Sequence, residues 1–213
     1  MALDEIVREL GAMYGRIAVP ALSPFEWIVL ENASYLVDDD RRWTVFESLR
    51  ERIGVAPEAI LAHDAEAIAD VIADGGMKPP MRAEKVLACA RIAKETGLAA
   101  LRDQRVLRRF PGIGEPSADK ILLFCADVPS LAPDSNALRV LTRLGYADEQ
   151  TSYARTYQLA VRATQPELRD AEAARAAHLL LRRHGQEVCK RAAPRCELCP
   201  LRARCAWYRR SRA

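Results

Sequence analysis

The chain has 213 residues and a formal net charge of +3, with half of its residues apolar and 29% charged. This is the composition of a folded globular protein, and the length allows one large domain or two small ones. No apolar run approaches the roughly 20 residues that a membrane span needs, and the N-terminal residues lack the apolar core of a secretory signal. We therefore expect a cytoplasmic protein, nucleoid-associated if it is bacterial, without a membrane partner.

The elements predicted along the chain are all helices, because alternating Val/Ile/Thr-rich runs are absent and Ala, Leu, Arg and Glu dominate. In chain order, helices are expected over 2–14, 24–37, 41–53, 64–73, 81–96, 103–109, 116–126, 136–144, 150–164 and 168–184. Pro79-Pro80 should precede one helix, and Gly97, Gly145 and Gly185 should follow the ends of three others. The predicted fold class is all-α.

A glycine-rich turn, Phe110-Pro111-Gly112-Ile113-Gly114, separates two of the short helices. Glycine lets a backbone approach a ligand closely, because no side chain blocks the contact. The N–H groups and the positive dipole end of the following helix attract an anion such as a phosphate. A G-x-G pattern is weak evidence by itself, so a plain helix–helix turn stays open as the alternative.

Asp134 directly precedes the helix expected near residues 136–144. It is therefore expected to be an N-cap that accepts hydrogen bonds from the first turn. The positive end of a helix also keeps a carboxylate ionised. A fixed anion of this kind is able to stabilise a sugar oxocarbenium ion or to orient a water, and the purely structural cap is the alternative interpretation.

Cys189, Cys196, Cys199 and Cys205 follow the spacing C-x6-C-x2-C-x5-C. Four thiolates within so short a segment indicate a metal centre, since grouped cysteines in a reducing cytosol more often bind metal than form disulfides. Zinc is the competing metal, but zinc sites usually contain two C-x2–4-C pairs, which the long outer gaps fit poorly. Two further cysteines, Cys89 and Cys125, lie in apolar helical patterns and are expected in the core.

The segment from Cys189 to the C-terminus is also strongly basic, with a local charge of +7 on a chain whose total is +3. Lys190, Arg191 and Arg195 lie between the first two cysteines. A cationic surface beside a metal centre favours a polyanionic partner. A solvated basic tail is the alternative.

The segments FPGIGEPSADKILLF and LAPDSNALRV, followed by this cysteine spacing, resemble the endonuclease III-like branch of the helix-hairpin-helix DNA glycosylases. The resemblance covers nearly the whole chain. It implies a two-lobed all-α fold, with a six-helix barrel over 22–132 that contains the helix-hairpin-helix near 103–126. An iron–sulfur cluster domain would comprise 1–21 and 133–213.

The same resemblance implies a [4Fe–4S] cluster on the four cysteines and a catalytic role for Asp134. The implied partner is double-stranded DNA with a damaged or mismatched base, which such enzymes extrude from the helix before cleavage. Nothing in the sequence indicates an assembly larger than a monomer.

The chain departs from the bifunctional relatives at the position of their nucleophilic lysine, which is Pro116 here. Proline has no nucleophilic side chain, so a lyase step by that route is not available. Lys120, one turn further along the helix, and Lys78 are the alternative amines, although exposed helix lysines are usually solvated. Asn136 replaces a histidine of the same relatives.

Counted from Pro24, Glu31 falls where the adenine-removing relatives carry their acid glutamate. Its apolar neighbours predict partial burial with a raised pKa, and a surface glutamate on an amphipathic helix is the alternative. Tyr35 and Leu36 fall where relatives insert a wedge into the base stack, with a plain core role as the alternative.

The preferred hypothesis is a monofunctional base-excision-repair glycosylase that hydrolyses an N-glycosidic bond. Asp134 would stabilise the cationic sugar, Glu31 would protonate the leaving base, and Gly112, Ile113 and Gly114 would hold a phosphate through backbone N–H groups. The alternatives are a non-catalytic protein that recognises bent or damaged duplex and a lyase that uses a displaced lysine. The sequence does not identify the base.

Overall fold

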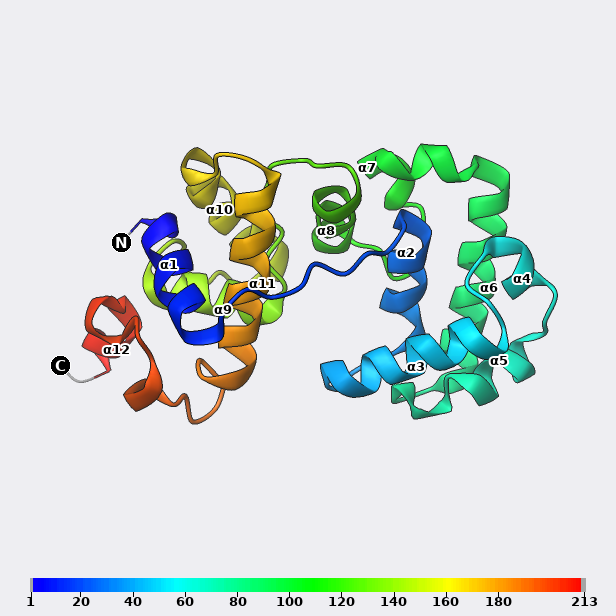
Figure 1. Cartoon of the computed structure of the whole chain (residues 1–213), viewed down its shortest axis with the longest axis horizontal. Helices are drawn as coiled ribbons and strands as arrows, with labels where there is room; N and C mark the ends of the chain where they lie inside the picture. Colours follow the sequence, from blue (N-terminus) through cyan, green and yellow to red (C-terminus); the bar gives the residue numbers. More distant parts are fainter. Residues whose placement is uncertain (1, 212–213) are drawn as a thin grey trace. The chain divides into compact units, whose positions relative to one another are not determined.

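The computed structural model describes residues 2–211 as a series of helices joined by short loops (Figure 1). Within that range the only β-type pairing is an isolated bridge between Tyr35 and Gly76. The predicted all-α class is therefore confirmed. None of the helices between these limits has both the length and the apolar character that crossing a bilayer requires.

Contacts divide the chain into two compact units. The first, which we call the hairpin unit, is Ala21–Cys125, and the second, the cysteine unit, combines Met1–Pro20 with Ala126–Ala213. The contacts group residues 126–132 with the cysteine unit, whereas the sequence analysis placed them in the barrel domain.

The hairpin unit is built around an apolar helix, α2, which packs against α3, α6 and α8. Apolar side chains on nearly every side bury α2, as expected for a core helix. The unit contains α2 (Pro24–Ala33), α3 (Asp39–Arg52), α4 (Pro57–Leu61), α5 (Ala65–Val71), η1 (Ala73–Gly75), α6 (Pro79–Thr96), η2 (Leu98–Arg102), α7 (Gln104–Leu107) and α8 (Glu115–Cys125).

The cysteine unit surrounds a second core formed by one face of each of its longer helices. It contains α1 (Leu3–Tyr14), α9 (Ser135–Leu144), α10 (Tyr153–Thr164), η3 (Gln165–Glu167), α11 (Ala171–Glu187), η4 (Cys196–Leu198), η5 (Arg202–Arg204) and α12 (Ala206–Arg210). Core side chains include Ile6, Leu10, Leu141, Tyr157 and Leu181, and Cys189 and Cys199 pack at its margin.

Two predicted helix ends differ from the structure in ways that matter for the site. The helix expected to reach residue 37 ends at Ala33, because Ser34 is extended and Leu36 adopts a left-handed φ of 58°. Gly185 does not follow a helix end, since α11 continues to Glu187. A Cβ on Gly185 would lie 2.5 Å from the Asn136 carbonyl oxygen, so this glycine lets α11 lie close against α9.

Other predicted helices differ from the observed ones because of their local sequence. Both Pro79 and Pro80 belong to the first turn of α6, where a missing N–H leaves no hydrogen bond unmade. The short helices α4 and α12 were not predicted, because each has only five residues. Five residues are too few to show a helical period.

Candidate functional site

The turn between α7 and α8 depends on a glycine at position 112. Gly112 has a left-handed φ of 75°, and a Cβ there would lie 2.5 Å from Oδ1 of Asn32. The buried Asn32 amide donates to the carbonyl oxygens of Pro111 at 2.9 Å and Ile28 at 3.0 Å. The turn is thereby attached to α2, and any larger residue at position 112 disturbs that attachment.

Ile113 and Gly114, the other two residues predicted to hold a phosphate, differ in how accessible they are. Ile113 is buried, and its N–H donates to the Phe110 carbonyl at 3.1 Å, so that donor is already used. The expectation that Ile113 offers an amide to phosphate is therefore corrected. Gly114 has open space, with Cδ of Pro116 at 3.8 Å as the nearest atom to a built Cβ.

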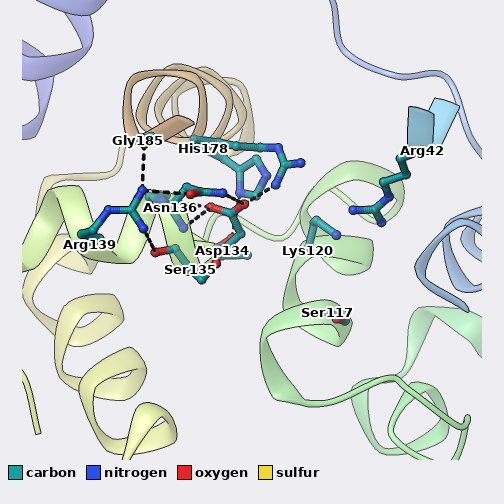
Figure 2. A network of polar contacts seen from close by, with 12 residues as sticks. Arg42, Ser117, Lys120, Asp134, Ser135, Asn136, Arg139, His178 and Gly185 are labelled. Carbon is teal, nitrogen blue, oxygen red and sulfur yellow. Dashed lines mark hydrogen bonds and ion pairs between the residues drawn. The ribbon is translucent and has the colours of Figure 1, made fainter. Parts of the chain in front are cut away.

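Glu31 lies at the centre of a partly buried polar group in the hairpin unit. Lys120 from α8 pairs with its Oε1 at 2.6 Å, Arg42 from α3 pairs with the same oxygen, and Ser117 Oγ donates to Oε2 at 3.1 Å. The ammonium of Lys120 also lies 5.1 Å from the centre of the Trp27 ring, a cation–π contact. Figure 2 shows the side chains of Arg42, Ser117 and Lys120 that supply these contacts.

The ionisation of Glu31 is opposite to the prediction. Burial raises its pKa, but the charges of Lys120 and Arg42 outweigh that effect and hold the pKa well below its usual range. Glu31 is therefore a carboxylate at neutral pH and does not supply a proton. The predicted raised pKa is wrong because the sequence does not show that two cations converge on this residue. The surface-glutamate alternative is also wrong, since only 15% of the side chain is exposed.

Asp134 is the N-cap of α9, as predicted. Its Oδ1 accepts hydrogen bonds from the N–H groups of Asn136 at 3.0 Å and Ala137 at 2.8 Å. Its Oδ2 pairs with Arg182 from α11, which the sequence analysis missed because the two residues are far apart in the chain. Side chain and main chain together therefore hold this carboxylate in one orientation, and its catalytic role stays a prediction.

Arg139 connects the Asp134 region to the first cysteine of the ligand segment, and Figure 2 shows its contacts with Asn136 and Gly185. Its guanidinium donates to Asn136 Oδ1 at 2.9 Å, to the Gly185 carbonyl at 2.7 Å and to the Cys189 carbonyl at 2.9 Å. Asn136 in turn donates its side-chain amide to Asp134 at 3.4 Å. The sequence offered no signal for this chain of hydrogen bonds, since an arginine on a helix is most often solvated.

The four cysteines of the predicted ligand set, Cys189, Cys196, Cys199 and Cys205, line one small pocket of about 20 Å³. Two nitrogen-bearing side chains from neighbouring helices contact their sulfurs. Arg143 donates to Cys189 Sγ at 3.3 Å, and Nε2 of His184 lies 3.3 Å from Cys199 Sγ. Among residues 2–211, no group of three or more His, Cys, Asp or Glu side chains is arranged to hold a metal ion.

The two other cysteines lie away from this pocket. Cys89 is fully buried, as predicted. Cys125 is only half-buried and donates to the Leu22 carbonyl at 3.3 Å, so the core prediction holds for it in part. Neither is disulfide-bonded.

The basic loop between the first two cysteines is held by α9. The guanidinium of Arg143 donates to the carbonyl oxygens of Lys190 at 2.7 Å and Arg191 at 3.1 Å. The side chains of Arg191 and Arg195 are exposed, and Lys190 is half-buried. A fixed backbone with exposed cations fits a phosphate-binding loop, and this role stays a prediction.

Tyr35 and Leu36 form an exposed apolar tip between α2 and α3. Their exposed fractions are 58% and 77%, so the plain core alternative is wrong. The Tyr35 N–H donates to the Gly75 carbonyl at 2.7 Å, which brings the neighbouring loop with exposed Met77 alongside. Exposed apolar side chains on strained backbone are often functional, and the sequence analysis missed Met77 as a member of this tip.

Buried Arg82 positions both loops of that tip. Its guanidinium donates to the carbonyl oxygens of Met77 at 3.0 Å and Gly76 at 2.9 Å, and also to Ala33 at the end of α2. One buried cation therefore satisfies several main-chain acceptors where α2 ends. Its role had no sequence signal, because Arg82 lies within an ordinary helical pattern.

The arrangement of helices is that of the helix-hairpin-helix proteins. A solved non-covalent endonuclease III–DNA complex matches with a TM-score of 0.80 at 23% identity and covers all of both chains. The Helicobacter pylori 3-methyladenine DNA glycosylase MagIII matches with a TM-score of 0.68 at 16% identity, over 88% of this chain and 98% of that one. Such low identities establish the fold alone.

Curated sequences show a likeness to endonuclease III and to an adenine DNA glycosylase. The endonuclease III of Rickettsia conorii is 28% identical over 153 residues, which are 71% of this chain and 70% of the relative. That of Thermotoga maritima is 25% identical over 98% of this chain and 94% of the relative. The adenine DNA glycosylase of Mycolicibacterium smegmatis is 31% identical over 88% of this chain and 62% of the relative. No family model matches the chain. In sequence and in fold the chain is therefore similar to the endonuclease III-like helix-hairpin-helix glycosylases.

Proposed function

We propose that this protein is a monofunctional DNA glycosylase, which hydrolyses the N-glycosidic bond of a damaged or mismatched base in double-stranded DNA. The observation that carries this proposal is that neither of two positions on α8 offers a free amine. Pro116 occupies the position of the family nucleophile, and Lys120 is held in an ion pair with Glu31 at 2.6 Å. An amine held as an ammonium does not attack a sugar carbon. We further propose that the protein acts as a cytoplasmic monomer.

Asp134 carries the chemical step in this proposal. Its carboxylate is fixed by two main-chain N–H groups and by Arg182, so it needs no reorganisation as charge develops. The C1′–N bond breaks with its electron pair leaving on the base, and Asp134 stabilises the cationic sugar. Water then forms the new C1′–O bond, oriented by the same carboxylate, and its proton passes to solvent.

DNA binding is proposed to use main chain and basic side chains together. The N–H groups of Gly112 and Gly114, at the start of α8, would contact one phosphate. Lys190, Arg191 and Arg195 would contact others through charge.

The exposed tip of Tyr35 and Leu36 would occupy the space that the extruded nucleotide leaves in the duplex. The exposure of both side chains supports this role, because a wedge must project from the surface.

The four cysteines are proposed to hold a [4Fe–4S] cluster. Their thiols line one pocket, and the long outer gaps of the cysteine spacing fit an iron–sulfur cluster better than a zinc site. Arg143 already donates to one sulfur and a His184 ring nitrogen contacts another, as is usual around cluster thiolates. When bound, the cluster supplies a cross-link for residues 189–205, since hydrolysis moves no electrons.

Iron and acid-labile sulfide analysis tests the cofactor. We expect about four of each per chain, and their loss in Cys196→Ala. Cys125→Ala is the matched control, because Cys125 lies outside the ligand pocket and should leave the iron content unchanged. One zinc per chain in protein purified without air would contradict the proposal.

Single-turnover cleavage of a panel of lesion duplexes tests the activity. We expect strand breaks only after hot alkali, because hydrolysis leaves an intact abasic site. A covalent complex trapped by borohydride would contradict a monofunctional mechanism. Lys120→Ala and Lys78→Ala would then identify the amine responsible.

One observation favours the second candidate, a binding protein without catalysis. Asp134 is paired with Arg182, whose positive charge opposes stabilisation of a cationic sugar. Binding to damaged duplex without base release from any member of the panel would support that candidate over the enzyme.

A further inference from the structure

A pocket of about 440 Å³ lies in the cysteine unit, and neither Asp134 nor any of the four ligand cysteines lines it. Its walls come from residues 135–143 of α9, the loop 147–151, the start of α10 and residues 207–210 of α12. We call it the α9–α12 pocket. Its volume falls within the roughly 300–1,000 Å³ of small-molecule sites, and the proposed function leaves it unused.

The charge of the α9–α12 pocket indicates the kind of ligand it binds. Its lining includes the arginines Arg139, Arg143, Arg191 and Arg210 and the acids Asp148 and Glu149. Within the described residues, no ion pair joins either acid to one of these arginines. Four cations against two carboxylates leave an excess of two positive charges. That excess matches a phosphate monoester, with about −1.5 to −2 charges at neutral pH, better than one DNA backbone phosphate.

The cysteine segment holds Arg143 in place beside the pocket. Its guanidinium donates to Cys189 Sγ at 3.3 Å and to the carbonyl oxygens of Lys190 at 2.7 Å and Arg191 at 3.1 Å. These bonds leave two of its five N–H groups for a ligand. A guanidinium that is already fixed loses little conformational entropy when it binds a phosphate.

An aromatic ring, Trp207 of α12, forms part of the wall. The Arg143 guanidinium lies 4.6 Å from the centre of this ring, and the cation–π contact orients both groups. Both residues also line the small pocket of the four cysteines, so they separate it from the α9–α12 pocket. Leu138 and Ala147 add apolar lining. Aromatic and apolar side chains of this kind suit a flat ring such as a nucleobase.

The two acids lie on a loop that α10 holds in place. The main-chain N–H of Gln150 donates to Thr156 Oγ1 at 2.9 Å, which attaches the loop 147–151 to α10. Asp148 and Glu149 come directly before Gln150. Carboxylates accept hydrogen bonds without donating any, so they suit the paired hydroxyl groups of a ribose. Deoxyribose lacks one of those hydroxyls, which distinguishes the expected ligand from a DNA strand.

We propose that the α9–α12 pocket binds a ribonucleoside 5′-monophosphate. The phosphate monoester pairs with the arginines of the pocket, the base lies against Trp207, and the ribose hydroxyls donate to Asp148 or Glu149. Binding is non-covalent, and the ligand leaves unchanged. The inference goes beyond the proposed glycosylase function and does not depend on it, because Asp134 does not line the pocket.

Calorimetric titration of the full chain with adenosine 5′-monophosphate tests the site. Adenosine lacks the phosphate and 2′-deoxyadenosine 5′-monophosphate lacks one hydroxyl, so each should bind at least about tenfold more weakly, the effect of a hydrogen bond to a charged group. Ribose 5-phosphate and inorganic phosphate lack the base and should also bind at least about tenfold more weakly.

Variants connect the binding to the pocket. Arg210→Gln removes one cation and should weaken binding of adenosine 5′-monophosphate about tenfold. Arg209→Gln is the matched control, because Arg209 is the neighbouring exposed arginine on α12 and does not line the pocket. Asp148→Ala combined with Glu149→Ala should abolish the preference for the ribonucleotide over the deoxyribonucleotide. Thermal melting establishes that each variant is folded.

Several results would overturn the inference. Inorganic phosphate that binds as tightly as adenosine 5′-monophosphate would indicate an unspecific anion site. Equal affinity for the ribonucleotide and the deoxyribonucleotide would exclude a role for the ribose. Absence of binding, or equal affinities in folded Arg209→Gln and Arg210→Gln, would exclude the pocket. Base release from lesion duplexes by the same preparation tests the glycosylase separately, so either proposal is able to fail alone.

Discussion

Glu31 in the hairpin unit and Asp134 in the cysteine unit are two carboxylates that are each paired with an arginine but held in place differently. Asp134 caps α9 and accepts two main-chain N–H bonds. Glu31 lies inside α2, where main-chain N–H groups are already used, so only side chains from α3 and α8 hold it. A carboxylate at a helix start is positioned by its own segment, and one inside a helix is positioned by its neighbours.

Substitution of each acid by its amide exploits this difference. An amide oxygen still accepts from main-chain N–H groups, so a cap survives the change. An amide does not neutralise the charges of Arg42 and Lys120, so the ion pairs around Glu31 do not survive the change. We therefore predict that Asp134→Asn mainly loses activity and that Glu31→Gln mainly loses stability.

The largest expected effect is that of Asp134→Asn on base release. The rate should fall about a thousandfold or more, because the fixed negative charge is lost. The free energy of unfolding should fall by less than it does in Glu31→Gln, since asparagine still caps the helix and only one cation, Arg182, loses its partner. Single-turnover kinetics and urea denaturation measure the two quantities.

Asp64→Asn is the control for that variant, because Asp64 caps α5 by accepting from the Ala67 N–H at 2.8 Å. Its base-release rate should equal that of the unmodified protein. Full activity in Asp134→Asn would rule out the charge-stabilising role.

Glu31→Gln should lower the free energy of unfolding by about 3–5 kcal/mol, the usual result of removing one partner from a buried ion pair. Glu47→Gln is the matched control, since Glu47 pairs with Arg50 at 3.0 Å on an exposed surface. It should cost less than about 1 kcal/mol. If urea denaturation gave similar losses of unfolding free energy for the two variants, the ion pairs of Glu31 would not stabilise the fold.

Acid titration provides a second view of Glu31. Its pKa is depressed in the folded state, so its stabilising contribution is complete above the unfolded-state pKa near 4.3 and is lost as pH falls below it. Between pH 5 and pH 3 the unmodified protein should lose about 1–2 kcal/mol more stability than Glu31→Gln does. Parallel pH profiles for the two proteins would contradict the ion-pair assignment.

Gly112→Ala and Gly11→Ala should have opposite effects. The first requires a strained left-handed φ and meets Asn32, so we expect a loss of about 1–3 kcal/mol and weaker DNA binding. The second lies within α1 with open space around it and should stabilise the protein by about 1 kcal/mol. Thermal melting measures both, and equal shifts would show that the turn tolerates a side chain.

The smallest expected effect concerns the basic loop. Arg191→Gln should weaken DNA binding a few-fold and flatten the slope of log affinity against log salt by about 0.9, the contribution of one phosphate contact. Arg162→Gln, on the exposed side of α10, should leave the slope unchanged. A salt titration with a fluorescent duplex distinguishes them, and identical slopes would remove Arg191 from the interface.

The sequence alone determined the features that depend on neighbouring residues. The all-α class follows from composition and period, the Asp134 cap from its place before an apolar helix, and the cysteine set from its spacing. The turn at 110–114 between two short helices followed from its glycines and proline. Each of these depends on composition or on residues that are near one another in the chain, so a single sequence carries the signal.

Only the tertiary structure decided how the acids and their partners meet. Lys120 and Glu31 are separated by 89 residues, and Arg182 and Asp134 by 48, so no local pattern indicates either pair. The same holds for Gly185, whose missing side chain matters only because α9 lies against α11. A pKa depends on the charges and burial that surround a group in space, and packing brings those charges together from distant segments.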